Sequence, residues 1–181
     1  MAQVSADEFL VEKARRGDQD AFSLLYESYR DRVFGFLYRL SGSTDLAEVM
    51  THDCFLRFVK ESEQTRTDRK IPLRLRLYST ARKLGMEYLL NSDHQFSQRV
   101  EKGDGDAIRN ETETLEAKVQ NAVLSLPFSE REVLILGEYE GFALNEIADV
   151  LQTDDRTVSD KLRTARRRLS EMLASYLPSR Q

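Results

Sequence analysis

Residues 143–169 read ALNEIADVLQTDDRTVSDKLRTARRRL, and this stretch decides the fold. Its first part predicts a short helix around Ile147 to Leu151, in which the small Ala148 lets another helix cross closely. A three-residue turn follows, and Asp154 is a favourable N-cap for a longer, basic helix. The pattern indicates a helix-turn-helix, whose second helix enters the major groove of DNA. Its buried stripe is Val158, Leu162, Ala165 and Leu169, and its outward residues are Arg156, Thr157, Ser159, Asp160, Arg163 and Arg167. The alternative is a purely structural helix pair, which the basic second helix disfavours.

The segment before this motif predicts two further helices. Leu115, Val119, Ala122 and Leu126 form an apolar stripe that Pro127 ends. A capping box then pairs Ser129 with Glu132 and opens a short helix through Tyr139, which Gly141 closes. The second half is therefore expected to be a four-helix domain.

The first half predicts three amphipathic helices. Apolar residues recur at three- and four-residue steps from Phe22 to Leu40, and Gly42 breaks the pattern. A second helix is expected from near Asp45, burying Ala47, Met50, Cys54 and Phe58. The third begins after Pro72, where Leu and Arg alternate as in a strand, but Leu73, Leu77, Ala81, Leu84 and Tyr88 hold the helical period for longer. On that helix Arg74, Arg82 and Lys83 avoid the apolar stripe, so they face either DNA or solvent.

Charge is unevenly distributed along the chain. The formal net charge is −4, which disfavours nucleic acid, yet residues 65–83 and 156–168 are two basic blocks. Residues 96–113 between them carry GDGD and an excess of acids, a composition typical of a flexible linker. We therefore expect an all-α fold of two small helical domains, 1–95 and 114–181, joined by a linker at 96–113.

Several classes of function have little support in the sequence. One cysteine among 181 residues permits no internal disulfide, and adjacent His52, Asp53 and Cys54 point in different directions on a helix, so no metal is expected. Two histidines without a nucleophile motif or phosphate-binding loop argue against an enzyme, a cofactor or a small-molecule substrate. No apolar run is long enough to span a bilayer, and the N-terminus does not resemble a secretory signal. We expect a cytoplasmic protein.

Five motifs in register resemble the extracytoplasmic-function sigma factors of the sigma-70 family over nearly the whole chain. Three lie in the first half, which resembles region 2: GDQDAFSLLYESY at 17–29, AEVMTHDCFL at 47–56 and RLYSTARKLGME at 76–87. Two lie in the second half, which resembles region 4: LPFSEREVL at 126–134 and EGFALNEIADVL at 140–151.

The resemblance implies a binding function in transcription initiation. It implies core RNA polymerase, promoter DNA and an anti-sigma factor as partners, with catalysis left to the polymerase. The implied polymerase-binding residues are Glu48, His52, Asp53, Phe55 and Leu56. Those implied for opening the minus-ten element and capturing a flipped base are Arg69, Lys70, Arg74, Arg76, Arg82, Lys83 and Glu87. The second helix of the helix-turn-helix, Arg156 to Arg167, would read the minus-thirty-five element.

Some positions depart from the family pattern. Arg76 stands at a usual Trp, Lys83 at a usual Asn, and Ala143 at a usual Ser N-cap. Ser159 and Asp160 replace a frequent Lys-Ser pair and so place a carboxylate on the helix expected to approach phosphates. These departures predict unusual promoter preference or weaker melting. They also motivate a rival hypothesis, a sigma-like DNA-binding regulator or decoy that opens no promoter itself.

Overall fold

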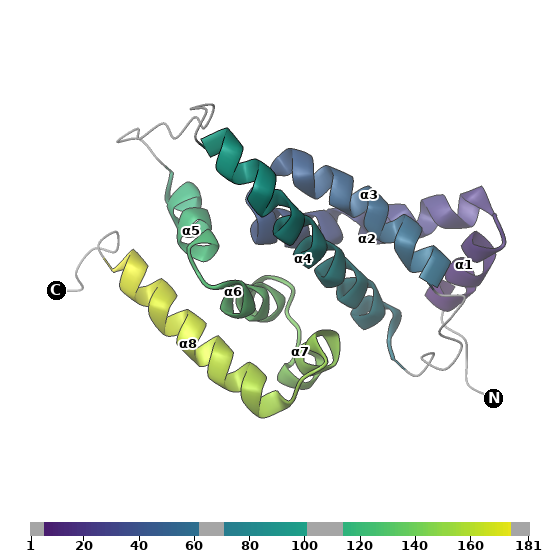
Figure 1. Cartoon of the computed structure of the whole chain (residues 1–181). Helices are drawn as coiled ribbons and strands as arrows, with labels where there is room; N and C mark the ends of the chain where they lie inside the picture. Colours follow the sequence, from purple (N-terminus) through teal and green to yellow (C-terminus); the bar gives the residue numbers. More distant parts are fainter. Residues whose placement is uncertain (1–5, 62–70, 101–113, 175–181) are drawn as a thin grey trace.

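The computed structural model describes residues 6–61, 71–100 and 114–174, and regular structure in these ranges is helical throughout. Figure 1 shows α4 running through the middle of the molecule, with α1, α2 and α3 on one side and α6, α7 and α8 on the other. The prediction of an all-α fold is confirmed. The helices are α1 (Ala6–Arg15), α2 (Gln19–Ser41), α3 (Thr44–Glu61), α4 (Leu73–Val100), α5 (Leu115–Leu124), α6 (Phe128–Leu134), the π-helix η2 (Ile135–Tyr139), α7 (Leu144–Leu151) and α8 (Asp155–Leu173).

Three of the four helices of the first half were predicted from the sequence, whereas α1 was not. The Asp18 carboxylate accepts a hydrogen bond from the Ala21 amide at 3.0 Å and caps α2. Gly42 ends that helix with φ 74°, a left-handed conformation that glycine adopts without strain. In α3, all four residues expected in the core are buried, and α4 begins directly after Pro72. The helical reading of the Leu-Arg segment is thus confirmed.

The second half contains the expected helices, but one predicted cap is wrong. The helix α6 begins at Phe128 with Pro127 at the N-cap position and no side-chain cap. Ser129 therefore lies within the first turn, where it cannot form the capping box. Glu132 turns away from it instead, because its carboxylate is buried against Arg82 of α4.

The two halves pack around one continuous apolar core. An aromatic chain joins them: Phe36 of α2 contacts Tyr78 of α4 edge-to-face at 5.3 Å between centroids, and Tyr78 contacts Phe142 at 5.0 Å. All three rings are buried. The predicted boundaries at 95 and 114 stay predictions. The helix α4 continues through Val100, and residues 101–113 of the predicted linker lie outside the described residues.

Candidate nucleic-acid and polymerase interface

The helix-turn-helix is formed by α7 and α8. Gln152, with φ 54°, ends α7 in a left-handed conformation, and Asp154 caps α8 by accepting the Thr157 amide hydrogen at 2.9 Å and its hydroxyl hydrogen at 2.7 Å. These hydrogen bonds hold the pKa of Asp154 below its ordinary value. Val158, Leu162 and Ala165 are buried against the domain, as predicted. The opposite side of α8 is thereby left to solvent.

The outward side of α8 presents most of the residues expected to read DNA. Arg156, Ser159, Asp160, Arg163 and Arg167 are exposed, whereas Thr157 is half-buried in its contact with the cap. Asp160 pairs with Arg163 at 2.7 Å, and Arg167 pairs with Glu171 at 3.0 Å. The Arg163 side chain remains 79% exposed despite its pair. Such exposed pairs are weak and can exchange for phosphate oxygens.

Three of the four arginines expected on the minus-ten side lie on α4, and all three are paired. Arg82 donates to Glu132 at 2.7 Å, Arg74 lies 3.1 Å from Glu146, and Arg76 pairs with Glu8 of α1. The Arg74 guanidinium also stacks 4.1 Å from the centroid of Phe142. Arg69 and Lys70 lie outside the described residues.

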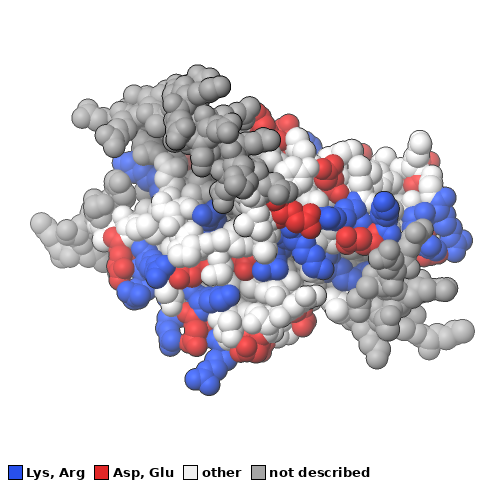
Figure 2. All heavy atoms as spheres, viewed as in Figure 1, with Lys and Arg blue, Asp and Glu red and all other residues white. Residues whose placement is uncertain are grey.

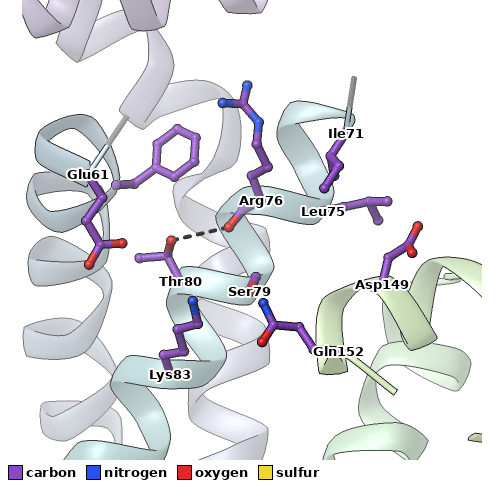
Figure 3. Close-up of a pocket in the computed structure, with 10 residues that line it drawn as sticks. Glu61, Ile71, Leu75, Arg76, Ser79, Thr80, Lys83, Asp149 and Gln152 are labelled. Atoms are coloured by element: carbon purple, nitrogen blue, oxygen red, sulfur yellow. Dashed lines mark hydrogen bonds between the residues drawn. The ribbon is translucent and has the colours of Figure 1, made fainter. Parts of the chain in front are cut away.

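Two further residues of this predicted set are exposed. Lys83 points to solvent, and Glu87 pairs with Arg57 of α3 at 2.7 Å. Residues of α3, α4 and α7 line an open pocket of about 160 Å³. Figure 3 shows Lys83 among the side chains around it. Arg76 and Thr80 line it from α4, and Asp149 and Gln152 face them from α7. The helix-turn-helix thus lies directly against the helix expected to open DNA.

The predicted polymerase-binding residues all lie on α3, but they differ in their exposure to solvent. Glu48, His52 and Leu56 are exposed, and Leu56 keeps half of its surface in solvent. Asp53 is half-buried and accepts a hydrogen bond from the Tyr88 hydroxyl at 2.6 Å, which raises the pKa of Tyr88. Phe55 is fully buried against Tyr26, so it supports this face from inside and does not line it. An exposed neighbour, Val49, extends the apolar part of the face.

Charged side chains of both signs alternate over the face of the molecule shown in Figure 2.

Burial raises the pKa of the Cys54 thiol to about 12, which leaves a protonated, inert core residue. Histidine, cysteine and carboxylate side chains do not cluster in a metal-binding group anywhere in the described ranges. Within those ranges, too, every helix is too short or too polar to cross a bilayer.

The side chains that sequence reasoning missed are three acids of the second half. Glu132, Glu140 and Glu146 contact Arg82, Tyr78 and Arg74 of α4. The four-residue spacing of the α4 partners was visible in the sequence. Their acidic counterparts lie in α6, directly after η2 and in α7, so no single helical repeat connects them and the sequence gave no comparable signal.

Comparisons with known proteins agree with this geometry. Residues 116–169 match the family profile described as "Sigma-70, region 4". The chain is 26% identical over 178 residues to the ECF RNA polymerase sigma factor SigW of Bacillus subtilis (strain 168), covering 90% of this chain and 94% of that protein. Among solved structures, it is similar to CnrH in complex with the cytosolic domain of CnrY, with a TM-score of 0.71, 21% identity, and coverage of 94% and 99%. It is also similar to the sigma factor RpoE in complex with the anti-sigma factor NepR from Bartonella quintana, with a TM-score of 0.63, 20% identity, and coverage of 84% and 96%.

The exposed, capped second helix of the helix-turn-helix and the matched region define a sigma-70-type DNA-binding protein. The five motifs lie in both halves, and the similarity to SigW extends over nine-tenths of the chain. The chain is therefore similar over nearly its whole length to extracytoplasmic-function sigma factors, and residues 116–169 match region 4 of the sigma-70 family.

Proposed function

We propose that this chain binds core RNA polymerase and directs it to promoters at which it starts transcription. The observation that carries the proposal is α8, a basic helix with an ordered cap and an outward face that is exposed from Arg156 to Arg167. A helix in this setting is suited to the major groove, where its first turns meet base edges and flanking residues meet phosphates.

The proposed division of labour follows the three helices that carry the predicted residues. The exposed face of α3 around Glu48, His52 and Leu56 binds the polymerase. The helix α4 and the residues before it contact the minus-ten element, and α8 contacts the minus-thirty-five element. The residues before Pro72 include Arg69 and Lys70, whose role stays a prediction. The protein works by binding in the cytoplasm, while the polymerase performs the chemistry.

Opening the minus-ten element requires a base to leave the stack, which costs a few kcal/mol. The described part of α4 offers Lys83 as an exposed cation on this helix, whereas Arg74, Arg76 and Arg82 are engaged. Because the family's usual Trp and Asn are replaced by Arg76 and Lys83, we propose that promoter preference differs from the common pattern.

An anti-sigma factor is the third proposed partner. The solved structures similar to this chain include a sigma factor held by an anti-sigma factor. A partner of this kind would compete with core polymerase for the first half. The rival role of a decoy is not favoured, because the similarity to an initiating sigma factor, SigW, spans both halves.

Reconstitution with core polymerase tests the proposal. The purified chain should co-elute with core enzyme in gel filtration, and the complex should protect DNA upstream of its own gene from nuclease. A chain that binds core enzyme but protects no DNA would support the decoy, and one that binds neither would refute both. An added anti-sigma candidate should release the chain from core enzyme, whereas simultaneous binding of both would exclude that role.

A further inference from the structure

Three acids of the second half contact one face of α4. On α4, Arg74, Tyr78 and Arg82 are spaced by four residues, so their side chains lie in one row along the helix. Glu146 pairs with Arg74, Glu140 accepts the Tyr78 hydroxyl, and Glu132 pairs with Arg82. We call Glu146, Glu140 and Glu132 the acidic row. It meets α4 in antiparallel order.

The acidic row is partly withdrawn from solvent: Glu132 is buried, whereas Glu140 and Glu146 are half-buried. The Glu132 side chain is 3% exposed and that of Arg82 is 23% exposed. Burial raises the pKa of Glu140, and the Tyr78 hydroxyl opposes this by donating to its carboxylate. Burying a carboxylate is costly unless a cation or donor compensates it, so each acid in this row depends on its partner across the contact. The contact between the halves is therefore specific as well as apolar.

A second group of polar contacts joins the halves at the C-terminal end of α2. The Arg131 guanidinium donates to the Leu40 carbonyl oxygen of α2 at 2.7 Å. Arg39 stacks on the ring of Tyr139 with its guanidinium carbon 4.5 Å from the centroid. The halves are thus connected on two sides of the aromatic chain formed by Phe36, Tyr78 and Phe142.

This closed arrangement is incompatible with simultaneous contact to both promoter elements. Elements centred at minus ten and minus thirty-five are about 25 base pairs apart, or roughly 85 Å along B-form DNA at 3.4 Å per pair. Here α4 and α7 touch, with Arg74 only 3.1 Å from Glu146. A compact chain of this length has a radius of gyration of about 16 Å and cannot span that distance. The halves must separate before both elements are bound.

The chain between the halves is long enough to permit separation. Fourteen residues lie between the end of α4 at Val100 and the start of α5 at Leu115. Fully extended, that many residues span up to about 50 Å, in addition to the width of the two domains. Opening therefore needs no unfolding of either half.

We propose that the acidic row is a built-in cover that mimics phosphates on the DNA-facing side of α4 and holds the free chain closed. Carboxylates occupy the guanidinium groups of Arg74 and Arg82, which phosphate oxygens would otherwise bind. Promoter DNA gains access to α4 when the second half leaves it, whereas the α3 face proposed to bind core polymerase is exposed in either state. The inference that the free chain is closed depends only on the contacts between the halves. The inference that closure blocks DNA binding rests on the proposed function.

The test uses the full chain with the triple variant E132Q/E140Q/E146Q. Its matched control is E130Q/E138Q/E171Q, because those carboxylates pair with Arg168, Arg166 and Arg167 within the second half. Both variants remove three negative charges from the same half, and the control additionally frees three arginines of α8, so tighter DNA binding by the triple variant than by the control exceeds any general electrostatic gain. Fluorophores on D31C and S170C report the distance between the halves, since both positions are exposed and the buried Cys54 stays unlabelled.

The triple variant should raise the ratio of open to closed molecules at least about tenfold, because Arg82 and Arg74 are then better solvated outside the contact. It should also bind a fluorescent single strand from the non-template side of its own upstream DNA more tightly than the control. Equal distance distributions in both variants would overturn the closed state. Opening without a gain in DNA affinity over the control would overturn the masking role. Failure of the proposed function would give a different result. The wild-type chain would not bind core polymerase, while the triple variant would still show a larger distance between the two fluorophores than the control.

Discussion

The carboxylate of Glu132 lies 2.7 Å from Nε of Arg82, and this pair joins α6 to α4 across the two halves. Glu132 is almost wholly buried, so its charge depends on the guanidinium of a residue fifty positions earlier. The helix expected to open promoter DNA is therefore also part of the contact with the helix-turn-helix domain. Its arginines have two possible sets of anionic partners, carboxylates in the free chain and phosphates on DNA.

Replacing Arg82 should destabilise the folded chain far more than replacing its neighbour Lys83. The R82M variant leaves Glu132 buried without its cation, and breaking such a pair costs about 3 kcal/mol or more. The K83M variant removes the same charge from an exposed side chain and should change stability by about 0.5 kcal/mol at most. Urea unfolding followed by circular dichroism measures both. Equal midpoints for the two variants would contradict the assignment of Arg82 to this pair.

Asp154 should contribute to the stability of α8 through its cap. The D154A variant loses the hydrogen bonds from Thr157 and should lower the midpoint of thermal unfolding. Because the first turn of α8 carries Arg156, loss of the cap should also lower the affinity for DNA. Thermal unfolding and DNA-binding anisotropy report the two effects, and D154S should restore most of both.

The same cap predicts a pH dependence with a definite sign. The hydroxyl and amide of Thr157 favour ionised Asp154 and so lower its pKa in the folded chain. Its contribution is complete above the ordinary value near 3.8 and is lost as the pH falls through the lower folded value. The difference in stability between the wild-type chain and D154N should therefore be constant from pH 7 to 5 and shift against the wild type below about 4. A difference that does not vary down to pH 2 would count against the charged cap.

Arg163 should matter more for DNA binding than Arg168 on the same helix. Arg163 lies on the outward face and is 79% exposed, whereas Arg168 pairs with Glu130 of α6. The R163A variant should weaken binding to duplex DNA by about 1–3 kcal/mol if it reads a base, or reduce the salt dependence by about one ion if it contacts phosphate. R168A removes an equal charge and should have a smaller effect. Titrations at several salt concentrations distinguish these results, and equal losses would show that the outward face is wrongly assigned.

Leu56 should be needed for core polymerase but not for folding. Its side chain is half-exposed on α3, so L56A should change stability by less than about 0.5 kcal/mol. Central apolar residues of an interface often cost more than 1 kcal/mol of binding when truncated. L115A is the matched control, because Leu115 is similarly exposed at the start of α5. Normal core binding by L56A in a competition assay would exclude this face.

Local patterns predicted the helices from α2 to α8, but neither α1 nor the contact between the halves. The apolar repeat in 22–40, the break at Gly42 and the cap at Asp154 each depend on neighbours within a few residues, so the sequence alone sufficed. The proposed capping box failed because Glu132 had a stronger partner in Arg82, fifty residues away. Such a partner becomes visible only when tertiary packing is known.

The candidate site divides in the same way. The outward face of α8 follows from helical periodicity, and the structure leaves most of it exposed as expected. On α3 the family motif includes Phe55, which the fold buries against Tyr26. A sequence motif does not distinguish a residue that contacts the partner from one that supports the contact surface from inside. On α4 the basic block suggested a free cationic surface. Acids from the second half cover this surface, so the charge of the segment did not predict whether its side chains are accessible to DNA.

Run-off transcription with purified core polymerase tests the central claim most directly. The template is the DNA upstream of the chain's own gene, and the core enzyme alone is the reference. We expect a discrete transcript that requires the chain, diminishes with R163A and L56A, and persists with R168A and L115A. A chain that binds core enzyme yet yields no transcript above the reference from this DNA or from a library of upstream regions would contradict its role as an initiating sigma factor.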